Sequence, residues 1–119
     1  GLMACAPQTQ GGATVAGSKG YLGVQTRILD SAILGVEVGM TGGATPEELD
    51  RYATCAAARY ALAHDFGFVR HLRTTLHQKG GVRRADAVYT ISPALPKGSR
   101  TIDAEVTVAD CAEQGIPTV

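Results

Sequence analysis

The amino-acid sequence predicts an α+β fold in which one helix packs on a mainly antiparallel sheet, with the element order β-β-α-β-β-β. Two observations lead to this prediction. Several short runs alternate apolar and polar side chains with a period of two, and one longer segment repeats apolar side chains at the three-and-four spacing of a helix. The connections between these segments are short. We therefore expect one α+β domain over residues 21–119, preceded by a separate lead-in over residues 1–20.

The first two strands are predicted at residues 21–30 and 32–41, with Asp30 and Ser31 as the turn between them. The second run places its apolar side chains on one face: Ala32, Leu34, Val36, Val38 and Met40. Because successive side chains of a strand point to opposite faces, we expect one packed face and one wet face. The glycines at 35 and 39 fall on the wet face and are compatible with close approach of a neighbouring element.

The helix has the clearest beginning of any element in the chain. Thr45 suits the N-cap, Pro46 suits the first helical position, and Glu48 completes a capping box. An apolar stripe follows at helical spacing: Leu49, Tyr52, Ala53, Ala56, Ala57, Tyr60 and Ala63. With Gly67 as the stop, we expect the helix to run to about His64, lying close on the sheet because most of the stripe is alanine.

Three more strands are predicted after the helix. Residues 68–77 fit a strand or a helix, and two threonines, the preceding glycine and the lack of a cap favour the strand. Residues 78–84 form a turn into a short strand at 85–91, which ends at a proline-broken loop over 92–99. Residues 101–109 show the cleanest alternation, with Ile102, Ala104, Val106 and Val108 on one face.

The composition narrows the possible functions. Lysine plus arginine equals aspartate plus glutamate at 11 each, which disfavours a nucleic-acid partner. The hydrophobic fraction is 45%, but much of it is alanine and tryptophan is absent, so the core should be thin and should gain from a covalent crosslink. No run approaches the roughly 18 to 20 apolar residues that span a bilayer. Any membrane attachment must therefore come from another feature.

The N-terminal residues suggest such an attachment. Leu2, Met3, Ala4 and Cys5 look like a bacterial lipobox, in which Cys5 is the lipidated residue and the three before it remain from a signal peptide. The alternative is an ordinary free cysteine behind a tag-derived glycine. Residues 6–20 are rich in glycine, threonine and glutamine, the composition of a flexible tether. This interpretation makes the membrane a partner through the lipid anchor.

The other two cysteines are expected to form a disulfide. If Cys5 is lipidated, Cys55 and Cys111 remain as an even pair, which in an exported protein favours a bond. Cys55 lies beside the buried stripe of the helix, and Cys111 follows the last predicted strand, where the chain can reach a covering helix. The competing interpretation is two buried free thiols in a cytosolic protein.

The stretch from Tyr21 to Cys111 also resembles the uncharacterised small lipoproteins of alphaproteobacteria. The resemblance rests on Gly20 with Tyr21 at the start of the first strand, on the alanine-rich helix segment 52–62, and on Gly67 with Phe68 at the start of the next strand. It implies a location in the cell envelope. It implies no assigned activity and supplies no catalytic residues.

The candidate binding residues lie in the second half of the chain. In the strand at 68–77, His71 and His77 would share a face about 20 Å apart at ~3.3 Å per residue, too far to hold one metal ion, so no metal is expected. Arg73 lies between them. Arg83 and Arg84, near a glycine pair, form a basic turn suited to an anionic lipid head group or polysaccharide, although a solvated hairpin tip is the preferred interpretation.

No catalytic motif is recognisable in the sequence, so we expect neither an enzyme nor a cofactor. The leading hypothesis is a non-enzymatic lipoprotein, anchored on the periplasmic side of the envelope, that is structural or binds another envelope protein or polymer. The alternative is a small ligand- or metal-binding sensor domain that uses His71, Arg73 and His77.

Overall fold

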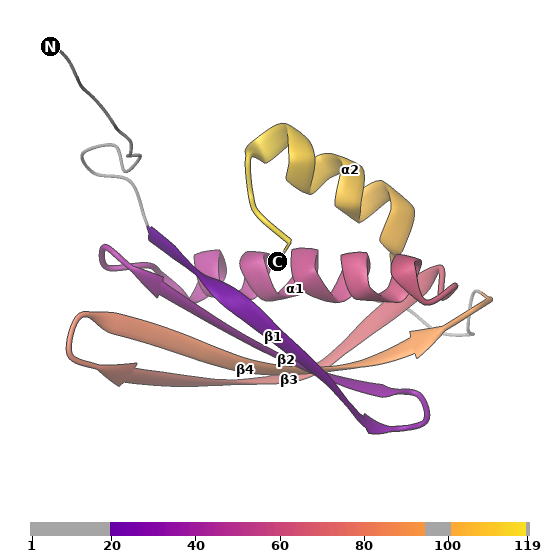
Figure 1. Cartoon of the computed structure of the whole chain (residues 1–119), viewed down its shortest axis with the longest axis horizontal. Helices are drawn as coiled ribbons and strands as arrows, with labels where there is room; N and C mark the ends of the chain where they lie inside the picture. The colour runs from indigo at the N-terminus through magenta and orange to yellow at the C-terminus, as the bar shows by residue number, and fades with distance from the viewer. Residues whose placement is uncertain (1–19, 95–100, 119) are drawn as a thin grey trace, which may run out of the picture.

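The computed structural model describes residues 20–94 and 101–118 (Figure 1). Cys5, the rest of the expected lipobox and the expected tether up to residue 19 lie outside the described residues. The described elements follow the order β-β-α-β-β-β-α, which confirms the predicted fold class and adds a second helix. They are β1 (Gly20–Asp30), β2 (Ile33–Thr41), α1 (Pro46–Ala63), β3 (Phe68–Lys79), β4 (Val82–Ser92), β5 (Thr101–Asp103) and α2 (Ala104–Gln114).

The five strands form one antiparallel sheet in the order β1-β2-β4-β3-β5. Helix α1 lies along one face of this sheet, and α2 lies on the far side of α1 (Figure 1). We call the sheet face that packs against α1 the helix face, and the opposite one the open face. No described helix covers the open face, so any function of the sheet surface is to be sought there.

The predicted hairpin is present, and its packed face is the helix face. Leu34, Val36, Val38 and Met40 are buried there, whereas Ala32 belongs to the turn and is exposed. On the open face, neighbouring side chains occupy the space beside the two glycines. A Cβ at Gly35 would stand 3.3 Å from Leu29 Cδ1, and a Cβ at Gly39 would stand 3.2 Å from Arg84 Nη1. The neighbouring groups expected at the glycines are therefore side chains of adjacent strands.

Helix α1 begins as predicted and is buried on more than one side. The Thr45 hydroxyl accepts from the Glu48 N–H at 3.1 Å, and the Glu48 carboxylate accepts from the Thr45 N–H at 2.7 Å. The helix ends at Ala63, as expected, but the left-handed residue after it is Asp65, with φ 67, rather than Gly67. The residues buried outside the predicted stripe are Cys55, Ala58 and Ala61. Helix α2 packs over α1 on a side away from the sheet, where Cys55 bonds Cys111.

The predicted strand at residues 101–109 is wrong beyond Asp103. The Asp103 carboxylate accepts from the N–H groups of Glu105 and Val106 at 3.0 and 3.2 Å, which makes it the N-cap of α2. The apolar alternation is also compatible with a helix, because Ala104, Val108 and Cys111 recur at helical spacing. Gly115, with φ 72, ends the helix. The cap residues at its two ends therefore favour a helix here, although the apolar side chains also alternate with a period of two.

Strand β3 confirms the preferred interpretation of residues 68–77, but it contains a bulge. His71 pairs with Tyr89 and Arg73 pairs with Val88, so Leu72 is the extra residue. Before the bulge odd-numbered side chains point to the helix face, and after it the even-numbered ones do. The expectation that His71 and His77 share a face is therefore wrong.

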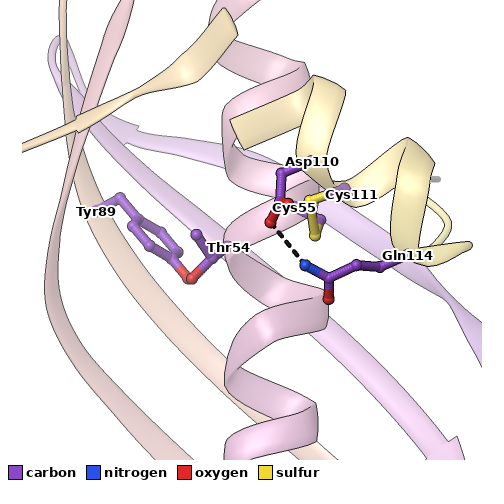
Figure 2. Close-up of a disulfide and its surroundings, with 6 residues drawn as sticks. All are labelled: Thr54, Cys55, Tyr89, Asp110, Cys111 and Gln114. Carbon is purple, nitrogen blue, oxygen red and sulfur yellow. Dashed lines mark hydrogen bonds between the residues drawn. A yellow bond between two sulfur atoms is a disulfide. The ribbon is translucent and has the colours of Figure 1, made fainter. Parts of the chain in front are cut away.

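The two helices are joined by the expected disulfide between Cys55 and Cys111, with Cα atoms 6.0 Å apart (Figure 2). Both cysteines are buried. The bond runs from α1 to α2, rather than from a helix to the end of a strand as the sequence suggested. On the sheet side of α1, the fully buried Tyr89 shares a 3.0 Å hydrogen bond with the Thr54 hydroxyl (Figure 2).

The two buried tyrosines make the fold sensitive to alkaline pH. Burial raises the pKa of Tyr89 and of Tyr52 above the ordinary value of 10.0, because the phenolate would lose its hydration. These two phenols ionise near pH 10 in the unfolded chain, whereas in the folded chain their ionisation needs a higher pH. We therefore expect stability to be intact below pH 10 and to fall progressively above it. Urea unfolding at pH 8, 10 and 11 measures this, and Tyr89→Phe should reduce the pH dependence; an equal slope in the variant would contradict this origin.

Candidate functional site

The open face carries a groove of about 410 Å³ over β1, β2, β4 and β3. Two rows of paired residues cross it. The first row contains Gln25, Glu37, Asp86 and Thr75, and the second contains Arg27, Gly35, Val88 and Arg73. In the middle of the second row lie Gly35, which the Leu29 side chain covers, and Val88. The two arginines lie on the outer strands of the groove, β1 and β3.

The groove brings opposite charges close together. Glu37 and Asp86 stand directly across from each other on the central strands, an arrangement that costs energy for like charges unless cations neutralise it. Arg27 and Arg73 belong to the next row, about 7 Å along the strands, within reach of long side chains. The arrangement suits a ligand that carries both a positive and a negative group.

Two of the predicted binding residues line this groove. Arg73 is on its β3 side, and His77 follows on the same face, with its Nε2 3.1 Å from Asp86 Oδ2. Both partners of this pair are half-exposed. His77 therefore orients the Asp86 carboxylate in an environment that solvent reaches.

His71 lies on the helix face, away from the groove. Its Nε2 is 2.6 Å from the Thr74 hydroxyl, which in turn donates to Asp50 Oδ1 of α1 at 3.4 Å. The His71 ring also stands edge-on to Tyr89, with centroids 5.4 Å apart. These contacts tie β3 to α1. The three residues of the alternative hypothesis, His71, Arg73 and His77, are therefore not one cluster.

The two arginines of the basic turn, Arg83 and Arg84, point to different faces of the sheet. Arg83 donates to the Ala44 carbonyl at 2.6 Å on the helix face, which anchors the loop before α1. Arg84 extends along the open face over Gly39. Adjacent strand residues point in opposite directions, so the two guanidinium groups do not form one anion site at the hairpin tip.

Sequence reasoning missed Arg27, Glu37 and Asp86 as groove residues. Each is an ordinary charged residue on an alternating strand, and only the pairing register brings the three together.

Within residues 20–94 and 101–118, no group of three histidine, cysteine, aspartate or glutamate side chains is placed to hold a metal ion. None of the helices of the described part is both long and apolar enough to cross a membrane.

Comparison with known proteins gives one family and one relative. A family model described as the YNQ4 C-terminal domain matches residues 21–115. A protein of Paracoccus denitrificans, described as an uncharacterized 26.9 kDa protein in the nqo8 5′ region, is 32% identical over 86 residues. The match covers 72% of this chain and 34% of that protein, so the chain spans about a third of its relative. No solved structure matches the chain.

These matches support part of the resemblance seen in the sequence. The relative is alphaproteobacterial and uncharacterised, as the resemblance implied. The family match begins at the first strand and ends one residue after α2, so it covers all seven described elements apart from Gly20. The chain belongs to the family of the YNQ4 C-terminal domain.

Proposed function

We propose that this chain is a non-enzymatic, lipid-anchored domain on the periplasmic side of a bacterial cell envelope, where it binds another envelope component through the open face. The observation that carries the proposal is the disulfide between Cys55 and Cys111. Such bonds persist in oxidising compartments and are rare in the reducing cytosol. An envelope location is consistent with the lipobox pattern that ends at Cys5.

The open face supports a binding role. It is free of any described helix, and its groove has charged groups of both signs and a polar rim of threonine and glutamine. Surfaces that recognise a partner combine such polar groups with some apolar area, which Leu29 and Val88 supply here. The partner proposed is an envelope protein or polymer.

The anchor is tested first. Full-length precursor expressed in a bacterium is expected in the membrane fraction, labelled by a clickable fatty acid, and Cys5→Ser should lose the label and move to the soluble fraction. Cys55→Ala with Cys111→Ala is the matched control, since it removes other cysteines and should keep the label. An unlabelled wild-type protein would refute the lipoprotein proposal whatever the fold.

The absence of catalysis is tested separately with the purified protein. No turnover is expected with generic ester, phosphate and peptide substrates. Activity that disappears in His77→Ala but persists in His64→Ala, a histidine outside the groove, would overturn the non-enzymatic proposal.

The second candidate function is a small-ligand sensor, favoured by the placement of Arg73 and His77 in the groove. Phosphoethanolamine carries both charges and is a suitable probe. In an NMR titration we expect shifts at groove residues with this compound that exceed those with inorganic phosphate or ethanolamine alone. Arg73→Gln should abolish them, and Arg59→Gln on α1 should not. Equal shifts with all three compounds would exclude this use of the groove.

A further inference from the structure

The two edges of the sheet differ in how they are protected. On one side, β5 pairs with the first part of β3, and the rest of β3 carries Arg73, His77 and Lys79. Charged side chains and covering segments of this kind prevent an edge strand from pairing with another chain. The other edge is β1, whose outer side has no strand partner among the described residues. The open backbone of β1 is therefore available for pairing.

Strand β1 is also the most apolar exposed element. Of the seven large hydrophobic side chains that are exposed in the described part of the chain, four lie on β1: Tyr21, Leu22, Ile28 and Leu29. The strand contains neither lysine nor proline. Its irregularities are at its two ends, where Leu22 and Leu29 interrupt the pairing with β2. Gly23 has φ 119, and its N–H donates to the Tyr52 hydroxyl at 3.0 Å, so residues 24–28 form the regular part of the strand.

We propose that β1 is the interface of a symmetric dimer, in which it pairs antiparallel with β1 of a second copy of this chain around Thr26. In this register Thr26 faces Thr26 of the second copy, Val24 faces its Ile28, and Gln25 faces its Arg27. Paired threonines and paired β-branched residues are among the favourable cross-strand neighbours. The dimer contains a continuous sheet with α1 of both copies on the same face.

Charge and side-chain direction select this register. Centring the pair on Arg27 would set two arginines directly opposite each other, which is destabilising. Centring it on Gln25 would pair Ile28, on the helix face, with Leu22, whose side chain lies over Gly39 on the open face. With Thr26 at the centre, the two residues of each pair between positions 24 and 28 point to the same face of the sheet. No like charges lie opposite each other in this register.

The contact is small compared with a permanent dimer, because it joins two edges rather than two broad surfaces. Interfaces below about 1,200 Å² belong to weak complexes. We therefore expect a concentration-dependent equilibrium with a dissociation constant on the order of micromolar. Light scattering on the Cys5→Ser chain should show a mass that rises from 12.3 kDa toward twice that value as concentration increases.

The test uses two leucine-sized residues of equal exposure on opposite edges. Ile28 on β1 and Leu72 on β3 are each 46% exposed. Ile28→Lys should raise the dissociation constant at least tenfold without changing the melting temperature by more than a degree or two, and Leu72→Lys should leave it unchanged. A wild-type chain that stays monomeric at high concentration overturns the proposal, as does a dimer lost in Leu72→Lys but kept in Ile28→Lys.

A crosslink tests the register. Residues directly opposite in an antiparallel pair have Cα atoms about 4.5 to 5.5 Å apart, which a disulfide can bridge. In the Cys5→Ser background, Thr26→Cys should oxidise to a covalent dimer through position 26. Thr75→Cys, an exposed threonine on β3, is the control and should crosslink at least tenfold more slowly. Equal rates for the two variants would refute pairing around Thr26.

Discussion

Replacing Cys55 and Cys111 together with alanine is expected to lower the free energy of unfolding by about 4 kcal/mol. The bond joins residues separated by 56 positions, and removing a loop of that length from the unfolded ensemble gives roughly this value in the chain-entropy model. For a domain of this size the change corresponds to a fall in melting temperature of roughly 20 °C. Thermal and urea unfolding of the variant and of the wild type measure the difference.

The effect should be concentrated in the second helix. Only Ala104 and Cys111 of α2 are buried, so α2 holds to α1 through little apolar area apart from the crosslink. Without the bond, amide protons of α2 should exchange faster than those of α1. Cys5→Ser is the control and should leave stability unchanged. A loss below 1 kcal/mol in the double variant would show that the crosslink does not constrain the fold.

Truncating Tyr89 to alanine is expected to cost about 4 kcal/mol, the range found when a large aromatic side chain is removed from a core. Tyr89 has no exposed surface, and its ring fills the space between β4 and α1. Most of the buried face of α1 is alanine, which is too small to fill the cavity. Urea unfolding gives the difference in free energy.

Tyr89→Phe separates the hydroxyl from the ring. It keeps the volume and removes the hydrogen bond with Thr54, so a loss of about 1 kcal/mol is expected. If the two Tyr89 variants were equally unstable, the hydrogen bond rather than the ring would dominate. If neither lost more than 1 kcal/mol, the packing inferred at this position would be wrong.

The parts of the fold that follow from local signals were predictable from the sequence. The capping box at Thr45 needs only two residues, and its hydrogen bonds form as the spacing implies. The first hairpin follows from alternation on either side of a turn. Helix α2 was not recognised because its apolar residues satisfy a period of two as well as a helical one. Asp103 and Gly115, which cap it at both ends, were the signals that distinguish the two.

The groove could be predicted only in part. Arg73 and His77 stand out in the sequence because both are polar side chains with nitrogen donors on one strand. Arg27, Glu37 and Asp86 join them through pairing between strands that are distant along the chain, and no local pattern encodes which residue faces which. His71 is separated from the set by the bulge, which depends on the pairing of β3 with β4.

That bulge shifts the alternation of side chains along β3 by one residue. On both sides of Leu72 the side chains alternate between the helix face and the open face, but the alternation after Leu72 is offset by one position. Deleting Leu72 would leave His71 opposite Tyr89 and Arg73 opposite Val88, so Val69 and His71 would stay on the helix face and the alternation would run without interruption. In relatives that lack one residue here, the side chains before this point should therefore stay on the same faces, and a gap in an alignment would mark the loss of the bulge rather than a reversal of faces.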